Sequence, residues 1–193
     1  MKTQLRLLAL LLIAGFLFTT NQADAQSLYD IAKVKTVDAD GRPDSMDVHC
    51  KVKGVVYGVN MSSTRLDFTI IDGTGGIKIF STPKFGYTPM EGDEVEVTGK
   101  VGFYNGLIEM VDLDTVIKLA SGKPLKKPRV ITKLGEGEES DLVKIIGVWL
   151  VTPIADWSGN ANYDITNGTD TFTLRVDRDT DVDGGPAPSG KFD

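Results

Sequence analysis

Alternating apolar and polar residues recur along the chain from Asp47 onward with the two-residue period of β-strands. In the run LDFTII at 66–71, for example, the apolar residues occupy alternate positions and would share one face of a strand. No apolar stripe with helical spacing extends convincingly over about ten residues. The pattern therefore predicts an all-β protein.

Five strands are expected in the first half of the chain, separated by turn residues. Asn105-Gly106 is the strongest hairpin signal, and the proline- and glycine-containing stretch 81–90 is expected to be a loop. A long first strand and a break between the third and fourth strands are typical of a Greek-key barrel of the OB type. The expected strands are 48–59, 66–71, 77–80, 94–104 and 107–119.

The same pattern returns later in the chain. Residues 52–57 are echoed at 145–150, and 68–74 are echoed at 163–169. The echo predicts two tandem OB-like barrels, the second with strands at 142–151, 161–166 and 171–176. Because no counterparts of the fourth and fifth strands follow, we expect the second barrel to be incomplete and the chain to be a fragment.

The N-terminus has the features of a Sec-type signal peptide. Lys2 and Arg6 precede an apolar run at 7–18, and Ala23 and Ala25 fit the cleavage site. We expect export to the periplasm, the cell surface or the medium, with no membrane anchor in the mature chain. The predicted organisation is a signal peptide at 1–25, an N-terminal arm at 26–46, a first barrel at 47–119, a linker at 120–140 and a partial second barrel at 141–193.

Charge and cysteine content narrow the class of function. The formal net charge is −6, and an acidic protein is a poor match for nucleic acid, whose affinity comes largely from Lys and Arg on phosphates. A single cysteine, Cys50, excludes an intramolecular disulfide. Its neighbour His49 would point to the opposite face of a strand, so we expect Cys50 to be a buried packing residue.

Three segments together resemble a known class of module. The runs KGVVYG at 53–58, FTIIDGTGGI at 68–77 and EGDEVEVTG at 91–99 look like the tandem OB-like modules of secreted and cell-surface proteins of Bacteroidetes. The resemblance implies architecture and export, and it brings no site residues with it.

No catalytic motif is present in the sequence. With one histidine, His49, neither a Ser-His-Asp set nor a His-rich metal cluster can be assembled, and the Gly-x-Ser-x-Gly and P-loop patterns are missing. The sequence therefore predicts a non-catalytic exported binding or spacer module. An alternative is the N-terminal accessory part of a larger secreted nuclease or phosphoesterase, whose enzyme domain would lie beyond residue 193.

One acidic loop has the spacing of half a calcium site. Asp179, Asp181 and Asp183 alternate ahead of Gly184, as in the first half of a calcium loop. Gly190 stands where a closing carboxylate is needed, so a plain polar loop is the other interpretation. A calcium-stabilised adhesion element is a further alternative function, and no other cofactor is predicted.

Aromatic residues supply the remaining candidates for ligand contact. OB barrels bind extended ligands on their second and third strands by stacking, although core packing explains many aromatics equally well. With cations scarce, a glycan or a protein is a better expected partner than an oligonucleotide. The candidates are Tyr57, Phe80, Tyr87 and Trp157.

Overall fold

The computed structural model describes residues 27–193, and the predicted signal peptide at 1–25 lies outside the described residues. Nearly all elements of the described chain are strands, and the two helical segments are only one short turn or so in length. The all-β prediction is therefore confirmed. In chain order the elements are β1 (Leu28–Tyr29), α1 (Ile31–Val34), β2 (His49–Tyr57), β3 (Leu66–Ile71), β4 (Gly76–Ser81), β5 (Glu94–Tyr104), β6 (Leu107–Ala120), β7 (Arg129–Ile131), the 3-10 turn η1 (Glu136–Glu138), β8 (Val143–Ile145), β9 (Trp149–Leu150), β10 (Ala161–Thr166) and β11 (Thr171–Val176).

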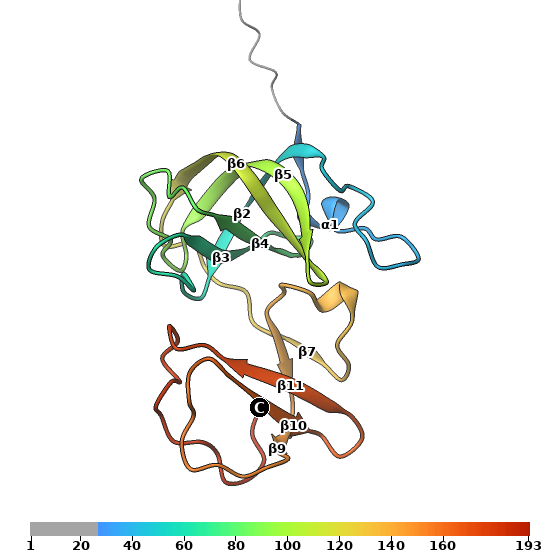
Figure 1. Ribbon diagram of the computed structural model, residues 1–193, viewed down its shortest axis with the longest axis vertical. Coiled ribbons are helices and arrows are strands. Elements are labelled where there is room, and N and C mark those ends of the chain that lie inside the picture. The colour runs from blue at the N-terminus through green and yellow to red at the C-terminus, as the bar shows by residue number, and fades with distance from the viewer. Residues whose placement is uncertain (1–26) are drawn as a thin grey trace, which may run out of the picture.

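Five of these strands close into a barrel of OB topology (Figure 1). The order is β2-β3-β4-β6-β5, and β5 returns to pair with β2. Only the β4–β6 pair is parallel, at Lys78↔Glu109 and Ile79↔Met110. β2 is shared between two neighbours, because its first seven residues pair with β5 and its last three pair with β3. This arrangement confirms the Greek-key barrel predicted from the strand order.

The strand faces follow the alternation in the sequence. In β3 and β4 the inward side chains Phe68, Ile70, Ile77 and Ile79 are all essentially buried. The β5–β6 hairpin turns at Asn105-Gly106, where both residues have positive φ, as a tight hairpin turn requires. Residues 82–90 contain no strand or helix, as expected.

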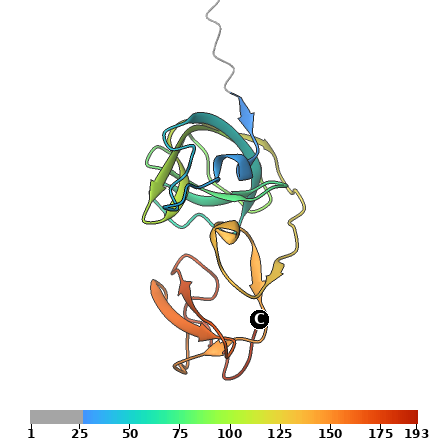
Figure 2. The same cartoon turned by 90° about the vertical axis from the view of Figure 1, so that its right-hand side faces the viewer.

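The N-terminal arm closes one end of the barrel (Figure 2). Ile31 and Val34 of α1 are 0% and 2% exposed and belong to the barrel core. A helix of four residues has no stability of its own in water, so its structure depends on these contacts. The prediction that the arm packs on the barrel is therefore confirmed.

The second unit repeats the first three strands of the barrel. β9, β10 and β11 form an antiparallel sheet in the order β11-β10-β9. β7 pairs in parallel with β8, just as β1 pairs in parallel with β2. The repeat thus includes the short parallel strand that precedes each sheet. The stretch 120–140, which was predicted to be a linker, contains β7 and η1. The single strand expected at 142–151 is divided into β8 and β9 around Gly147, which has a φ of 70°.

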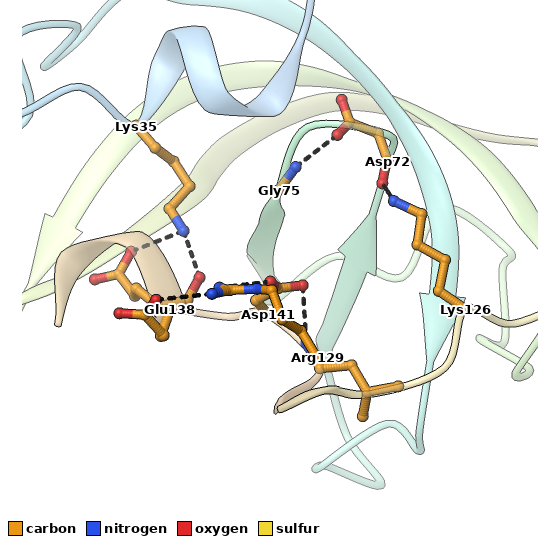
Figure 3. A network of polar contacts seen from close by, with 9 residues as sticks. Lys35, Asp72, Gly75, Lys126, Arg129, Glu138 and Asp141 are labelled. Carbon is orange, nitrogen blue, oxygen red and sulfur yellow. Dashed lines mark hydrogen bonds and ion pairs between the residues drawn. The ribbon is translucent and has the colours of Figure 1, made fainter. Parts of the chain in front are cut away.

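A compact junction joins the two units (Figure 3). Lys35 reaches down from the end of α1 and forms an ion pair with Glu139 at 3.7 Å. Glu139 in turn accepts from the backbone N–H of Ile108 in β6. At Gly76 a β-carbon would lie 1.8 Å from the carbonyl oxygen of Ser140, so only glycine permits this approach of the two backbones.

Candidate functional site

Three adjoining hollows form a groove on the outer face of β3 and β4. Their volumes are about 820, 460 and 610 Å³. Lys78 lines all three, while Arg65 and Asp67 line the first two. Because the hollows share these walls, they make one elongated groove, here called the β3–β4 groove.

Strand register brings its central side chains together. In β3 and β4 the residues that alternate with the buried core, Asp67, Thr69, Lys78 and Phe80, face outward. Antiparallel pairing sets Asp67 opposite Phe80. The parallel β4–β6 pairing places Lys78 beside Glu109, so the groove floor combines residues from three strands.

Electrostatics in the groove floor are dominated by one cation between two carboxylates. Lys78 forms an ion pair with Asp67, and Glu109 is only 7% exposed. Burial raises the pKa of Glu109. The negative charges of Asp67 and Glu139 raise this pKa further, while the positive charge of Lys78 opposes the shift. The floor is therefore a place where a polar ligand group could exchange hydrogen bonds with Lys78 and Glu109.

The groove as a whole has an excess of carboxylates. Its cations are Arg65, Lys78, Arg175 and Arg178, and its acidic residues are Asp47, Asp67, Glu91, Glu109, Asp112, Asp177, Asp179 and Asp181. A phosphate backbone needs neutralising cations, so this lining favours an uncharged ligand over a polyanion.

Aromatic groups lie at both ends of the groove. Phe80 borders the largest hollow, with the Arg65 guanidinium 5.0 Å from its ring centroid. Tyr104, at the rim of the same hollow, is 66% exposed. Tyr57 borders the opposite end, where its hydroxyl accepts from the backbone N–H of Lys126 at 2.7 Å. Of the four aromatic candidates from the sequence, Tyr57 and Phe80 thus line the groove.

The other two aromatic candidates have packing roles. Tyr87 is 8% exposed and lies in the barrel core, where its hydroxyl donates to Asp93 at 3.0 Å. Trp157 is half-buried in the second unit, with ring centroids of Tyr163 at 5.0 Å and Phe192 at 6.4 Å. These positions depend on side-chain packing, which the alternation in the sequence does not show.

The acidic loop after β11 forms a wall of the groove. Asp179 lines the second hollow, Asp181 lines the third, and Asp183 accepts from the backbone N–H of Gly159 at 2.6 Å. Within residues 27–193, no three His, Cys, Asp or Glu side chains are grouped so that they could hold a metal ion. The calcium interpretation stays a prediction, and what the structure shows of these three carboxylates is their place in the groove wall and at the Gly159 backbone.

Cys50 and His49 lie on opposite sides of β2. Cys50 is 0% exposed, and burial raises the pKa of its thiol, which disfavours the nucleophilic thiolate. His49 is exposed and its Nε2 lies 2.6 Å from Asp114. The prediction that Cys50 is a packing residue is confirmed.

Sequence reasoning missed most of the groove floor. Alternation predicts that Lys78 faces outward, but nothing in the sequence pairs it with Glu109, because that neighbour comes from the parallel β4–β6 ladder. Arg65 has no signal in the sequence beyond its place directly before β3.

Comparisons with known proteins give one informative relative. No protein-family profile matches the chain. The chain is 31% identical over 145 residues to "Endonuclease YhcR" of Bacillus subtilis (strain 168), covering 68% of this chain and 12% of that protein. The chain thus spans about an eighth of this relative's length, and the match alone does not carry the relative's activity to it.

Two solved structures are similar to part of the chain. The hypothetical protein ygiW from E. coli is 20% identical, with a TM-score of 0.37 over 48% of this chain and 90% of that one. A putative aspartyl-tRNA synthetase from Leishmania major Friedlin is 12% identical, with a TM-score of 0.41 over 53% of this chain and 22% of that one. The OB assignment made here rests on the strand order of the barrel itself. The resemblance to Bacteroidetes modules stays a prediction.

Proposed function

We propose that this chain is an exported, non-catalytic binding module that holds an extended polymer in the β3–β4 groove. The observation that carries the proposal is the continuity of the groove through Lys78, which borders all three hollows. An elongated groove with aromatic groups at its two ends suits a chain-like ligand better than a compact one.

Export is inferred from the leader at 1–25, and N-terminal sequencing of the secreted protein tests it by finding Gln26 first. In the described chain, residues 27–193, no helix has the length and apolar character needed to cross a membrane.

A neutral glycan is the ligand class that the lining supports best. The carboxylates outnumber the cations, which repels a polyanion. Hydroxyl groups of a sugar can hydrogen-bond to Lys78 and Glu109, while an apolar sugar face can stack on Phe80 or Tyr104.

A glycan array followed by calorimetry on the best neutral oligosaccharide tests this proposal. We expect Phe80→Ala to weaken binding about tenfold, in line with the loss of one stacking contact. Lys53→Ala serves as the matched control, because Lys53 is an exposed residue of β2 outside the groove. Absence of binding to every glycan, or equal affinity of the Phe80 variant, would contradict the proposal.

A second candidate is an accessory binding role in a secreted nuclease, and the endonuclease relative specifically favours it. In that case the ligand is single-stranded nucleic acid, and Arg65, Lys78, Arg175 and Arg178 would contact its phosphates. Electrophoretic shift of an oligo-dT probe separates the two candidates. Suppose that oligo-dT binds, that its binding weakens steeply with salt and with Lys78→Ala, and that no glycan binds. This result would identify nucleic acid, and not a glycan, as the ligand.

A further inference from the structure

Charge is distributed unevenly along the β3–β4 groove. The hollow of about 460 Å³ lies in the middle, because it shares Arg65 and Asp67 with the largest hollow and Met61 with the third. The largest hollow is lined by two cations and four carboxylates, and the third by one cation and two carboxylates. The middle hollow is lined by three carboxylates and four cations, which are Arg65, Lys78, Arg175 and Arg178. The groove is therefore negative at its two ends and positive at its centre.

Two of the three carboxylates in the middle hollow already have partners. Asp67 forms an ion pair with Lys78. Asp177 lies 3.9 Å from the guanidinium of Arg175 and accepts a hydrogen bond from the backbone N–H of Asp179 at 3.1 Å. The third carboxylate, on Asp179, belongs to an exposed residue. These pairs use the charges of Lys78 and Arg175 and leave those of Arg65 and Arg178.

Arg65 and Arg178 have hydrogen-bond donors to offer to a ligand. The Arg65 guanidinium lies 5.0 Å from the ring centroid of Phe80, and stacking of this kind leaves its N–H groups available. Neither arginine forms an ion pair within residues 27–193. A guanidinium presents its donors as a planar fork that fits the oxygens of an anion. The middle hollow thus contains two cationic groups suited to one anionic group.

The loop that carries Arg178 is held in place by backbone packing. A β-carbon at Gly159 would lie 2.6 Å from the Cα of Arg178, so only glycine permits this approach. Asp183 accepts a hydrogen bond from the backbone N–H of Gly159 at 2.6 Å. The backbone N–H of Gly184 donates to the carbonyl oxygen of Trp157 at 3.0 Å. A loop fixed at these points loses less conformational freedom when it binds a ligand.

We propose that the middle hollow binds a single acidic group on an otherwise uncharged glycan. This inference rests on the proposed function, since it specifies one sugar of the polymer in the same groove. The acidic group is a carboxylate or a sulfate ester, because each has one negative charge and several oxygens that accept from Arg65 and Arg178. Uncharged sugars extend from it on both sides, because the carboxylates of the outer hollows repel further negative charge. The ligand is therefore a mainly neutral polysaccharide with isolated acidic sugars.

Four small sugars that differ only in the group at C6 test the selection for charge. They are methyl glucoside, methyl glucuronoside, the methyl ester of methyl glucuronoside, and methyl glucoside 6-sulfate. NMR of the isotope-labelled full chain follows the side-chain Nε–H resonances of its arginines. We expect the glucuronoside or the sulfate to shift the resonances of Arg65 and Arg178 saturably. The two uncharged sugars should bind at least about tenfold more weakly, and added salt should reduce this difference.

Two variants separate a local effect of Arg178 from a general effect of charge. Arg178→Gln should remove the preference for the charged sugars, because it deletes one guanidinium and keeps a polar side chain. Lys53→Gln is the matched control, since it removes one positive charge from an exposed residue of β2 outside the groove. It should leave the preference unchanged. On the glycan array, chains with isolated uronic acids or sulfate esters should bind more strongly than neutral chains and polyuronates.

Several results would overturn the inference. Equal shifts with charged and uncharged sugars, or a preference that Arg178→Gln does not alter, would remove the acidic group and leave glycan binding in the groove intact. Strongest binding of polyuronates would show that the groove accepts charge at every sugar. Binding of oligo-dT with no binding of any sugar would assign the arginines to phosphates of nucleic acid. Absence of binding to every glycan and every small sugar would overturn the proposed function and this inference together.

Discussion

Oδ2 of Asp72 accepts a hydrogen bond from the backbone N–H of Ile31 at 2.9 Å, across 41 positions of sequence. Oδ1 of the same carboxylate accepts from the backbone N–H groups of Thr74 and Gly75 and so closes the β3–β4 turn. One side chain therefore shapes a hairpin and caps α1 at the same time. In the second unit Asn167 closes the equivalent turn by accepting from Thr169 and Asp170.

Replacing Asp72 by Asn should separate the two roles of this side chain. Asn keeps one acceptor oxygen for the turn and loses the acceptor for Ile31, so we expect a loss of about 1 kcal/mol in the free energy of unfolding. Urea denaturation followed by circular dichroism measures the loss, and hydrogen exchange should show faster exchange of the Ile31 amide. Asn167→Asp is the matched reverse change, and it should leave the arm unaffected. Unaltered exchange at Ile31 in the Asp72 variant would contradict the capping role.

Asp93 should make the stability of the barrel depend on acid pH. Burial by itself would raise the pKa of Asp93, but hydrogen bonds from Lys118, Tyr87 and Ser121 outweigh it and the net shift is downward. A carboxyl group with a lowered folded-state pKa stabilises the fold above its unfolded pKa of about 3.9 and loses this contribution as pH falls through the folded value.

We therefore expect the stability difference between wild type and Asp93→Asn to be largest above about pH 4 and to shrink below it. Urea denaturation at a series of pH values measures this difference. Asp112→Asn, at a mostly exposed carboxylate with a 3.4 Å ion pair to Lys100, is the control and should show little change. A difference that is constant with pH would disprove the role assigned to Asp93.

Gly76→Ala should separate the two units while leaving the barrel closed. The added methyl group would collide with the Ser140 carbonyl oxygen, 1.8 Å from the β-carbon position. We expect faster amide exchange in residues 136–141 and a larger radius in small-angle scattering. Gly73→Ala is the matched control, since nothing lies within 4 Å of its β-carbon position. If both variants behave alike, the junction does not depend on Gly76.

The Lys35–Glu139 pair should show strong coupling in a double-mutant cycle. Its side chains are 10% and 14% exposed, and burial lowers the pKa of Lys35 against the opposing effect of Glu139. Lys35→Met should cost about 2 kcal/mol, because it leaves the Glu139 carboxylate poorly solvated. Adding Glu139→Gln should recover part of this loss. Additive effects of the two changes would show that the pair does not hold the junction.

Local signals in the sequence identified nearly every strand. The predicted bounds of β3, β5, β10 and β11 agree with the structure, because each strand has one apolar face and a turn residue at its end. The short strands β1 and β7 were not predicted, and the strand predicted at 142–151 is not continuous. Gly147 interrupts it, and the β9–β10 register is shifted by one residue from the sequence echo, so that Leu150 and not Trp149 takes the inward place of Val56.

The candidate site was only partly predictable. Phe80 could be named because aromatic residues on the third strand of an OB barrel are typical ligand contacts. Tyr87 was named only as an aromatic residue of the loop that follows this strand, and its ring fills the barrel core. A single aromatic side chain in a loop has no alternation to reveal which way it faces, so its role depends on what packs against it.

By itself, the sequence determined the strand content, the hairpin at Asn105-Gly106, the burial of Cys50 and the presence of a repeat. These properties depend on neighbours along the chain, through side-chain alternation and turn conformation. Only the tertiary structure decided that Asp72 caps α1, that Lys78 meets Glu109, and that Trp157 packs against Tyr163. These contacts depend on how the whole chain folds back on itself, which no local sequence pattern encodes.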